Sequence, residues 1–568
     1  MKRKRYDGTA AVTSLLLLFA LLVIAGCGGS SSNTTSTGTT TTTTQATTTG
    51  DMNIASYAVS VAASASSYNA EDVISNTSFD TVVTINFTAN TAQLASGAAQ
   101  AITTDGVTLL TANGKTLTIA KTTNGITVTS AVDAKVRYNL SGKLGGTLTV
   151  ASAVVYQLYL DGVTISPTAG PALDLESTQK VFIVTAAGST NTLSDASTRS
   201  MTMKAALYGK GAMIFSGHGT LNVAGSYKHA VFSNDYIRVQ GGTLNVTVSA
   251  KDAIRSVNGF IFDDGVLTVS ATGTTTGDES KGIKVEGSET TGIGKGYIVI
   301  NGGYITVTSV GKAISAGWDI DEDATTTTTS DDPSPYVVIN NGVIVITATG
   351  TPYEYVSNGT TVSCSPEGIE AKTALTINSG YLLVNTTDDA LNAGKAITIN
   401  GGYVYTASSA NDAIDSNGTL TITGGVIVAI GASVPEGAFD CDQNTFTITG
   451  GTFVGIGGAT STPTTSTCKQ NAVILGSGTK DTTLAVKASN GAVVFAFTAP
   501  QAYATMLLSS PSISTGTTYS VYTGGAATAD KYFKGLYLDN LGYSGGTAGS
   551  SFTVSSCLTN LGSGGSRF

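Results

Sequence analysis

Acidic side chains recur at two positions of a short sequence repeat, and these groups are well suited to bind a cation. The segment NDAIDSNGTLTITGG begins with Asp412 and Asp415 on either side of an alanine and an isoleucine. Like charges one repeat apart repel each other unless a cation or water screens them. Oxygen ligands in such an array suit Ca²⁺ better than transition metals. We therefore predict a calcium site with the candidate ligands Glu367, Glu370, Asp388, Asp389, Asp412, Asp415, Asp440 and Asp442.

A second acidic group lies in the segment WDIDEDA, where Asp319, Asp321 and Asp323 have the D-x-D-x-D spacing that begins an EF-hand loop. The glycine and glutamate that complete an EF-hand are missing at the expected positions, so this motif is weak by itself. The alternative interpretation of all these carboxylates is a solvated edge that blocks strand pairing and keeps the protein soluble.

Lysine and tyrosine side chains of the repeat are candidates for contact with a sugar. Tyr304, Tyr381 and Tyr403 follow equivalent glycine-containing turns, and we expect Tyr381 and Tyr403 on neighbouring repeats. Aromatic rings can pack against the C–H faces of sugars, although tyrosine also simply favours strands. An acidic protein binds an anionic glycan through bridging Ca²⁺ or through cationic side chains, and the candidate lysines are Lys281, Lys284 and Lys312.

The repeat itself predicts the fold. A small residue follows each polar start, and most starts are about 23 residues apart, which is typical of a parallel β-helix and not of a propeller. The longest step, from Ala313 to Gly368, is interpreted as roughly two periods plus an insertion. Aliphatic residues such as Ile254 and Ile414 are expected to point inward, between outward polar residues. The chain is therefore predicted to be an all-β solenoid, with the small residues at Ala230, Ala253, Gly282, Ala313, Gly368, Ala390, Ala413 and Gly437.

Two ladders of mostly charged residues are expected to point outward from this solenoid. The first precedes the small residue and consists of Asp252, Lys281, Lys312, Glu367, Asp389, Asp412 and Glu436. The second follows the inward aliphatic residue and consists of Arg255, Lys284, Ser315, Glu370, Asn392, Asp415 and Asp440. At the turns, glycine supplies positive φ, and a hydrogen-bonded side-chain ladder is expected for Asn301, Asn378 and Asn400.

Regions outside the repeat differ in composition. Residues 1–27 combine basic residues, a short apolar run and Ile-Ala-Gly-Cys27, which resembles the lipobox of bacterial lipoproteins and predicts lipidation of Cys27. An ordinary secretory signal with an incidental cysteine is the alternative. Residues 28–50 are expected to be a Ser/Thr-rich tether. We predict an N-terminal β cap over 51–150, solenoid repeats over 151–472, and a C-terminal β region with a Gly/Ser-rich tail over 473–568.

Composition excludes several classes of function. The chain of 568 residues has a net charge of −9 and a pI near 4.8, which would repel nucleic acid. Zinc is not expected, because CxxC is absent and the chain has 2 histidines. Four cysteines remain after Cys27, and an exported protein meets conditions in which disulfides form. Three pairings are possible, and we favour Cys441 with Cys468, which flank a Ser/Thr-rich insertion.

Several motifs resemble one known family in their order along the chain. They are the DAI and EGI starts, the TINGGY and TITGG turns, and the segment YKHAVFSNDYIRVQGGTLNVTVSAKDAI. Over roughly residues 130–525 the chain is similar to the bacterial carbohydrate-binding parallel β-helix family. This resemblance implies a calcium-containing, right-handed β-helix, related in fold to pectate lyases, that binds plant polysaccharides such as cellulose and polygalacturonic acid. The chain departs from the family's acidic pattern at Lys281 and Lys312, and its four later cysteines differ from that pattern.

We therefore predict a non-catalytic protein that binds polysaccharide with Ca²⁺ and is lipid-anchored in the cell envelope, exposed outside the cytoplasm. Two alternatives remain. A lyase would need Ca²⁺ to acidify the uronate α-proton and a lysine or arginine to remove it, and carboxylates for glycoside hydrolysis are also plentiful. A structural or adhesive surface protein is the other alternative. No Ser–His–Asp arrangement, Walker loop or HExxH motif occurs in the sequence.

Overall fold

The computed structural model describes residues 69–199, 203–286, 296–317, 335–357 and 359–562. The predicted lipidation site Cys27 and the acidic group Asp319, Asp321 and Asp323 lie outside these residues. The described chain is all-β, as predicted, and its helical residues form only the short 3₁₀ turns η1 (Ala70–Asp72) and η2 (Ile74–Asn76). Within the described ranges, no helix has the length and hydropathy required to span a membrane.

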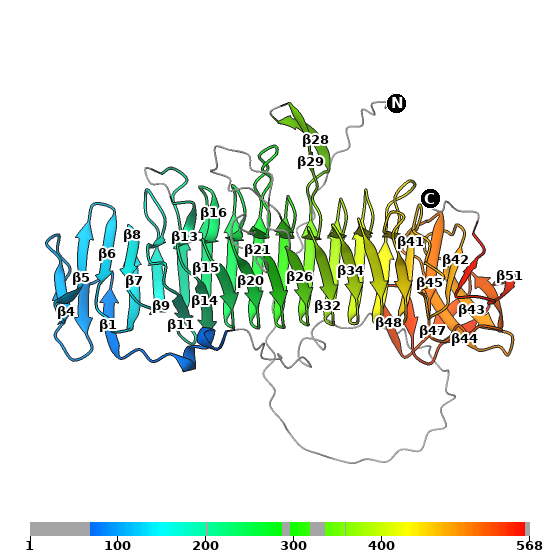
Figure 1. Ribbon diagram of the computed structural model, residues 1–568, viewed down its shortest axis with the longest axis horizontal. Coiled ribbons are helices and arrows are strands. Elements are labelled where there is room, and N and C mark those ends of the chain that lie inside the picture. The colour runs from blue at the N-terminus through cyan, green and yellow to red at the C-terminus, as the bar shows by residue number, and fades with distance from the viewer. Residues whose placement is uncertain (1–68, 200–202, 287–295, 318–334, 358, 563–568) are drawn as a thin grey trace, which may run out of the picture. The chain divides into compact units, whose positions relative to one another are not determined.

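Most strands belong to three stacks, in which each strand pairs in parallel with the equivalent strand of the next repeat (Figure 1). The chain passes through the stacks in turn, for example from β19 to β20, β21 and β22. The first stack consists of β1 (Thr81–Asn86), β7 (Val136–Leu144), β9 (Tyr156–Ile165), β11 (Val181–Thr185), β14 (Met213–Gly217), β17 (Tyr236–Val239), β20 (Gly259–Phe262), β23 (Tyr297–Ile300), β26 (Tyr336–Ile339), β31 (Ala374–Ile377), β34 (Ala396–Ile399), β37 (Thr419–Ile422) and β40 (Phe446–Ile448).

The second stack begins beside the later part of β9. It consists of β12 (Thr190–Ser194), β15 (Thr220–Gly225), β18 (Thr243–Val248), β21 (Val266–Ala271), β24 (Tyr304–Ser309), β27 (Val343–Ala348), β32 (Tyr381–Thr386), β35 (Tyr403–Ser408), β38 (Val426–Ile430) and β41 (Thr452–Gly457). The third stack consists of β6 (Gly125–Ser130), β8 (Thr147–Ser152), β10 (Leu173–Leu175), β13 (Ala205–Gly209), β16 (His229–Ser233), β19 (Ile254–Ser256), β22 (Ile283–Glu286), β25 (Ile314–Gly317), β30 (Ile369–Ala371), β33 (Leu391–Ala393), β36 (Ile414–Ser416) and β39 (Phe439–Asp440).

The apolar core lies between the stacks, because alternate side chains of each strand point the same way. The inward aliphatic residues were predicted correctly in the third stack, where Ile254, Ile283 and Ile314 pair in sequence and are at most 1 % exposed. Ile314 then pairs directly with Ile369. The interpretation of the long step as two periods is therefore wrong, because this step is a single repeat that holds an inserted hairpin.

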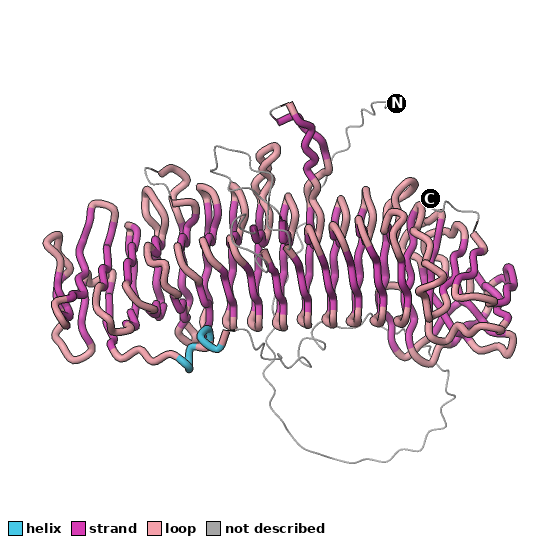
Figure 2. Tube along the Cα trace, viewed as in Figure 1, coloured by secondary structure: helices cyan, strands magenta, loops and turns pink. Residues whose placement is uncertain are grey.

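The inserted hairpin consists of β28 (Tyr353–Ser357) and β29 (Thr360–Cys364), which pair antiparallel and project from the row of turns in Figure 1. It follows β27 and precedes β30, so it arises at the end of the second stack. Several connections between stacked strands are short, such as the one between β33 and β34, and Figure 2 shows loops alternating with the strands.

Asparagine side chains form the predicted ladder at one turn of each repeat. Asn340 donates to Asn301, Asn378 donates to Asn340, and Asn400 donates to Asn378, each over 2.8 Å. The neighbouring glycines have the positive φ that this turn needs, for example +87° at Gly402. The asparagine side chains of this turn therefore form hydrogen bonds with the equivalent asparagines of adjacent repeats, which favours the same turn in each repeat.

Both ends of the stacks are covered by strands that pair mostly antiparallel, which protects open edges from pairing with other chains. The N-terminal strands are β2 (Thr91–Leu94), β3 (Gln100–Ala101), β4 (Val107–Ala112) and β5 (Lys115–Thr122). The C-terminal strands are β42 (Ala472–Leu475), β43 (Thr483–Ala488), β44 (Val493–Thr498), β45 (Thr505–Ser509), β46 (Thr518–Thr523), β47 (Ala526–Thr528), β48 (Lys531–Phe533), β49 (Leu536–Leu538), β50 (Gly542–Ser544), β51 (Thr547–Thr553) and β52 (Leu558–Asn560). The parallel pairing of β6 with β8 shows that the third stack begins before residue 151.

Candidate carbohydrate and cation sites

The second predicted ladder runs across the third stack in the expected register. Arg255, Lys284, Ser315, Glu370, Asn392, Asp415 and Asp440 pair successively from β19 to β39. These side chains do not form a solvated wall, because the exposed fraction is 5 % for Lys284 and 2 % for Glu370. The alternative interpretation, a solvated edge, therefore does not fit these positions. Buried charges require partners, and the ladder divides into a cationic part and an anionic part.

The cationic part of the two ladders contains the three predicted lysines, Lys281 and Lys312 of the first ladder and Lys284 of the second. They line one cavity of about 360 Å³ together with Lys372, Glu279 and Glu370. Lys312 forms ion pairs of 2.8 Å with both Glu367 and Glu370, and Lys372 also pairs with Glu370. Four lysines and two glutamates line this cavity in an otherwise acidic protein, and the excess of lysines suits an anionic ligand. We call it the lysine cavity.

The inserted hairpin forms one side of the lysine cavity. Tyr355, Val362, Ser363 and Cys364 belong to the hairpin and line the cavity. The hairpin is held to the loop between β21 and β22, where Glu279 lies. Tyr353 donates to the Glu279 carboxylate, and the Cys364 thiol donates to it over 3.0 Å. Burial and the Glu279 carboxylate raise the pKa of Cys364 to about 11.

Sequence reasoning missed the contributions of Lys372, Glu279 and Tyr355. The hairpin itself has a readable signal, because Asn-Gly at 358–359 stands between alternating strand residues. No sequence motif near the hairpin predicts that it packs over the lysines.

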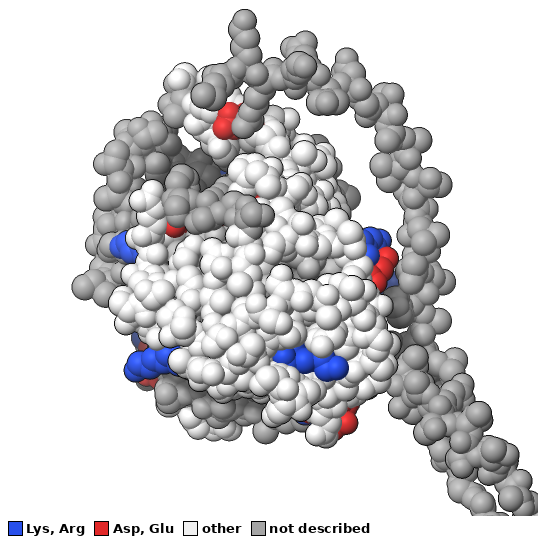
Figure 3. Space-filling view, turned by 90° about the vertical axis from the view of Figure 1, so that its right-hand side faces the viewer, with Lys and Arg blue, Asp and Glu red and all other residues white. Residues whose placement is uncertain are grey.

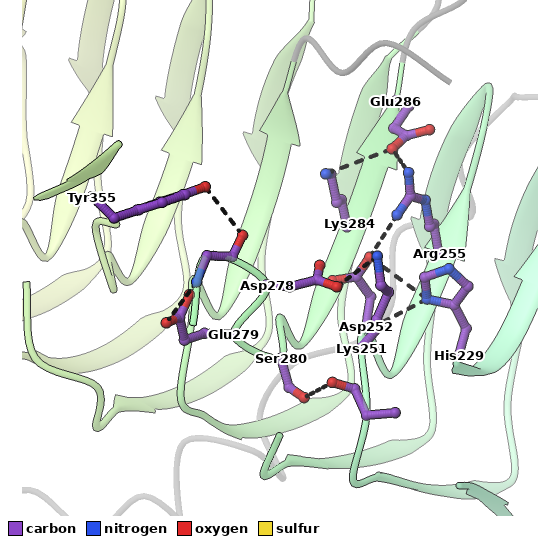
Figure 4. A network of polar contacts seen from close by, with 12 residues as sticks. His229, Lys251, Asp252, Arg255, Asp278, Glu279, Ser280, Lys284, Glu286 and Tyr355 are labelled. Carbon is purple, nitrogen blue, oxygen red and sulfur yellow. Dashed lines mark hydrogen bonds and ion pairs between the residues drawn. The ribbon is translucent and has the colours of Figure 1, made fainter. Parts of the chain in front are cut away.

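Next to the lysine cavity lies a network of buried charges (Figure 4). Arg255 pairs with Asp252 over 3.0 Å and also with Glu286, while Lys284 lies 3.5 Å from Glu286. Burial, together with the neighbouring Lys281 and Arg255 charges, lowers the pKa of Lys284 well below its ordinary value. Although burial opposes it, Lys281 and Arg255 hold the pKa of Asp252 below its ordinary value.

The anionic part of the two ladders contains three of the predicted calcium ligands. Carboxylate oxygens of Asp412, Asp415 and Asp440 all lie within 4.8 Å of one another. Asn392 donates to Asp415 over 3.2 Å, and the backbone N–H of Asp442 donates to Asp440 over 2.9 Å. We call these three aspartates the acid cluster.

The chemistry of the acid cluster fits a hard divalent cation. Its donors are all oxygen, and three carboxylates can supply up to about six ligand atoms, near the six to eight that Ca²⁺ takes. Burial and the Asp412 and Asp440 charges raise the pKa of Asp415 to about 8. A cation placed among the carboxylates would relieve this repulsion.

The other predicted ligands have different surroundings. Glu367 and Glu370 pair with lysines and line or border the lysine cavity, so the structure does not place them with the acid cluster. Asp388 accepts from Asn411 over 2.6 Å, and Asp389 accepts from the backbone N–H of Asp412 over 3.1 Å. Asp442 is exposed beside the cluster.

The predicted tyrosine ladder is covered by the C-terminal strands. Tyr381 and Tyr403 are neighbours across β32 and β35, as predicted, with ring centroids 6.2 Å apart. Phe533 packs edge-on against both rings, at 5.6 and 5.4 Å, and Tyr381 is 1 % exposed. Tyr381 therefore has no open face for a sugar. Tyr304 and Tyr403 are half-buried against the same apolar cluster.

The four described cysteines carry free thiols, so the Cys441–Cys468 disulfide stays a prediction. Cys441 is buried in the core after β39, and its thiol donates to the carbonyl of Asn444 over 3.6 Å. Cys468 lies in a turn and donates to the carbonyl of Phe446.

Comparison with known proteins assigns the chain to a class. The family model described as carbohydrate-binding domain-containing protein matches residues 114–413, just over half of the chain, and the chain belongs to this family. The matched range includes the whole lysine cavity and ends at Ala413, inside the acid cluster. The polysaccharide lyase-like protein from C. thermocellum, solved as a gadolinium derivative, is similar at 16 % identity and a TM-score of 0.36, covering 56 % of this chain and 96 % of that chain. No curated protein matches.

Proposed function

We propose that this protein binds acidic polysaccharide without catalysis and that the lysine cavity receives a carboxylate-bearing sugar. The gathering of Lys281, Lys284, Lys312 and Lys372 around one cavity carries this proposal. A volume of about 360 Å³ lies within the range of small-ligand pockets, which begins at about 300 Å³. Membership of a carbohydrate-binding family supports the ligand class. Polygalacturonate has the required charge, whereas cellulose would have to bind without it.

Calcium is proposed to bind at the acid cluster. The all-oxygen donor set and the mutual repulsion of the buried carboxylates support this assignment. A bound divalent cation would also reduce the negative charge of this part of the third stack. That reduction favours approach of an anionic chain toward the neighbouring lysines.

The arrangement and anchoring of the protein are part of the proposal. Each repeat passes once through the three stacks in the same order, and equivalent strands pair in parallel. This arrangement supports a parallel β-helix, and we propose that the helix is right-handed. The basic, apolar and Cys27-containing sequence of residues 1–27 supports export and lipidation at the cell envelope. Incorporation of a fatty-acid label in the unaltered chain, and its loss on Cys27→Ala, tests the anchor.

One observation favours a lyase as a second candidate. Lys284 lines the lysine cavity, and burial lowers its pKa, which increases the fraction of neutral amine that can remove a proton beside a uronate carboxylate. A lyase would release unsaturated uronates, which absorb in the ultraviolet. A rise in absorbance with polygalacturonate, lost in Lys284→Met, would replace the proposed function by this one.

Affinity electrophoresis in gels containing polygalacturonate tests the binding proposal. The double variant Lys281→Gln/Lys372→Gln removes two charges from the cavity, and we expect its Kd for polygalacturonate to rise by about tenfold or more, because each lost ion pair weakens binding. Lys395→Gln is the matched control, since Lys395 is an exposed lysine that does not line the cavity. Equal retardation of the double variant and the unaltered protein would contradict the assignment.

Calcium binding is measured separately, without glycan, because Ca²⁺ also cross-links polygalacturonate. We expect added Ca²⁺ to raise the melting temperature of the unaltered protein and EGTA to reverse the change. Asp415→Asn should remove most of this response, whereas Asp105→Asn, at an exposed aspartate far along the chain, should retain it. A melting temperature that does not respond to Ca²⁺ in the unaltered protein would rule out this site.

A further inference from the structure

Two cysteines that are distant in sequence meet at the C-terminal end of the stacks. Cys468 lies in the turn that follows β41, and Cys557 directly precedes β52. The backbone N–H of Cys468 donates to the carbonyl of Thr464 over 3.1 Å. The thiol of Cys557 donates to the carbonyl of Thr465, in the same turn, over 3.4 Å. Both thiols therefore lie against a single turn.

The backbone also holds the two cysteines in place. The N–H of Ala472 donates to the carbonyl of Cys557 over 2.7 Å, and β52 continues in parallel beside β42. The Cys557 thiol lies close enough to influence Cys468, and burial together with this neighbour raises the pKa of Cys468. Both side chains are half-buried and not enclosed in the core.

We propose that Cys468 and Cys557 form a disulfide that fastens β52 to the last repeat. One thiol, as its thiolate, attacks an external disulfide, such as glutathione disulfide or an oxidised dithiol protein, and forms a mixed disulfide while one external thiolate leaves. The second cysteine thiolate then attacks the protein sulfur and releases the other external thiolate. The two cysteines lose two protons and two electrons, and the external disulfide is reduced to two thiols.

The remaining described cysteines are poorly placed to compete. Burial raises the pKa of Cys441 to about 11, and Cys441 is buried in the core. Cys364 lies in the hairpin, where its thiol donates to Glu279. The disulfide encloses the C-terminal strands β42 to β51 in one loop, which restricts the unfolded chain and should stabilise this region.

Disulfide mapping of the full chain tests the proposal. The native protein is equilibrated with glutathione disulfide, free thiols are alkylated in denaturant, and the peptides are analysed without reduction. Trypsin alone leaves Cys441 and Cys468 in one peptide, because no lysine or arginine occurs between Lys395 and Lys469. Additional cleavage before aspartate separates them at Asp442. We expect a cross-linked peptide pair containing Cys468 and Cys557, with Cys364 and Cys441 alkylated.

Variants and stability provide the controls. Cys441→Ser should keep the cross-link, and Cys468→Ser should leave Cys557 without a protein partner. Reductant should lower the melting temperature of the oxidised unaltered protein by several degrees and leave that of Cys468→Ser unchanged. Alkylation of both Cys468 and Cys557 after oxidation, separate glutathione adducts on them, or a Cys441–Cys468 cross-link would each overturn the proposal.

Discussion

At the residue scale, the charges of the third stack are stabilised by one another and not by solvent. Lys312 shows this clearly, since burial lowers the pKa of a lysine but the Glu367 and Glu370 carboxylates raise it above its ordinary value. Although burial opposes it, Lys312 and Lys372 hold the pKa of Glu370 below its ordinary value. Removing Lys312 would leave Glu367 and Glu370 buried with less compensation. The binding test therefore uses the half-exposed Lys281 and Lys372, because Glu370 keeps Lys312 as a partner when Lys372 is replaced.

A buried carboxyl elsewhere in the same stack predicts a pH dependence. Asp174 is 2 % exposed, its Oδ1 has no hydrogen-bond partner among the described residues, and burial and Glu176 raise its pKa to about 7. Between about pH 4 and 7 the folded state therefore binds more protons than the unfolded state. Stability falls as pH rises through this window, by at most about 1.4 kcal/mol per pH unit for this group.

Asp174→Asn should remove this contribution, because the amide does not ionise. We expect the variant to melt at a higher temperature than the unaltered protein at pH 8, with the difference shrinking toward pH 5. Asp105→Asn, at an exposed aspartate, serves as the control. A difference between Asp174→Asn and the unaltered protein that is the same at both pH values would show that Asp174 is ionised throughout.

At the element scale, the glycine turns set how closely successive repeats can approach. Gly425 has a φ of +92°, and a Cβ there would lie 3.0 Å from backbone atoms of Gly401 and Gly402 in the preceding repeat. Both the positive φ and the close approach therefore require glycine at this turn. The inserted hairpin shows the opposite case, since the same stacking tolerates a long insertion where the chain leaves the second stack.

Gly425→Ala should destabilise the protein by about 1–3 kcal/mol, the usual cost of a strained backbone position. The control is Gly145→Ala, because a Cβ at Gly145 meets no atom within 4 Å. Thermal unfolding followed by circular dichroism should show a lower melting temperature for Gly425→Ala alone. Identical melting curves for the two variants would mean that the turn relaxes without strain.

At the scale of the whole folded region, the C-terminal strands cover an apolar surface of the second stack. Tyr381, Val428 and Val454 belong to one buried cluster with Phe533 and Leu536 of the C-terminal strands. The surface at this end shows only scattered charged side chains (Figure 3). The structure therefore separates a covered, weakly charged end from the lysine cavity in the middle of the third stack.

Phe533→Ala should loosen this cover, because truncating a buried phenylalanine costs about 3–5 kcal/mol and Phe533 contacts both Tyr381 and Tyr403. We expect faster proteolytic cleavage within residues 473–562 and stronger binding of an apolar fluorescent dye. Val356→Ala, at a hairpin side chain that is 72 % exposed, should change neither. Unchanged protease resistance in Phe533→Ala would show that other contacts hold the cover.

The sequence by itself determined the local pattern of this protein. Alternation identified core residues such as Ile254 and Ile414, and repetition placed Lys284, Asp415 and Asp440 in one ladder, because strand geometry and stacking act within and between adjacent repeats. Only the tertiary structure decided which members of that ladder are buried, paired or gathered around a cavity. Those outcomes depend on the hairpin that packs over the lysines and on the C-terminal strands that cover Tyr381, and such long-range packing leaves no periodic trace in the sequence.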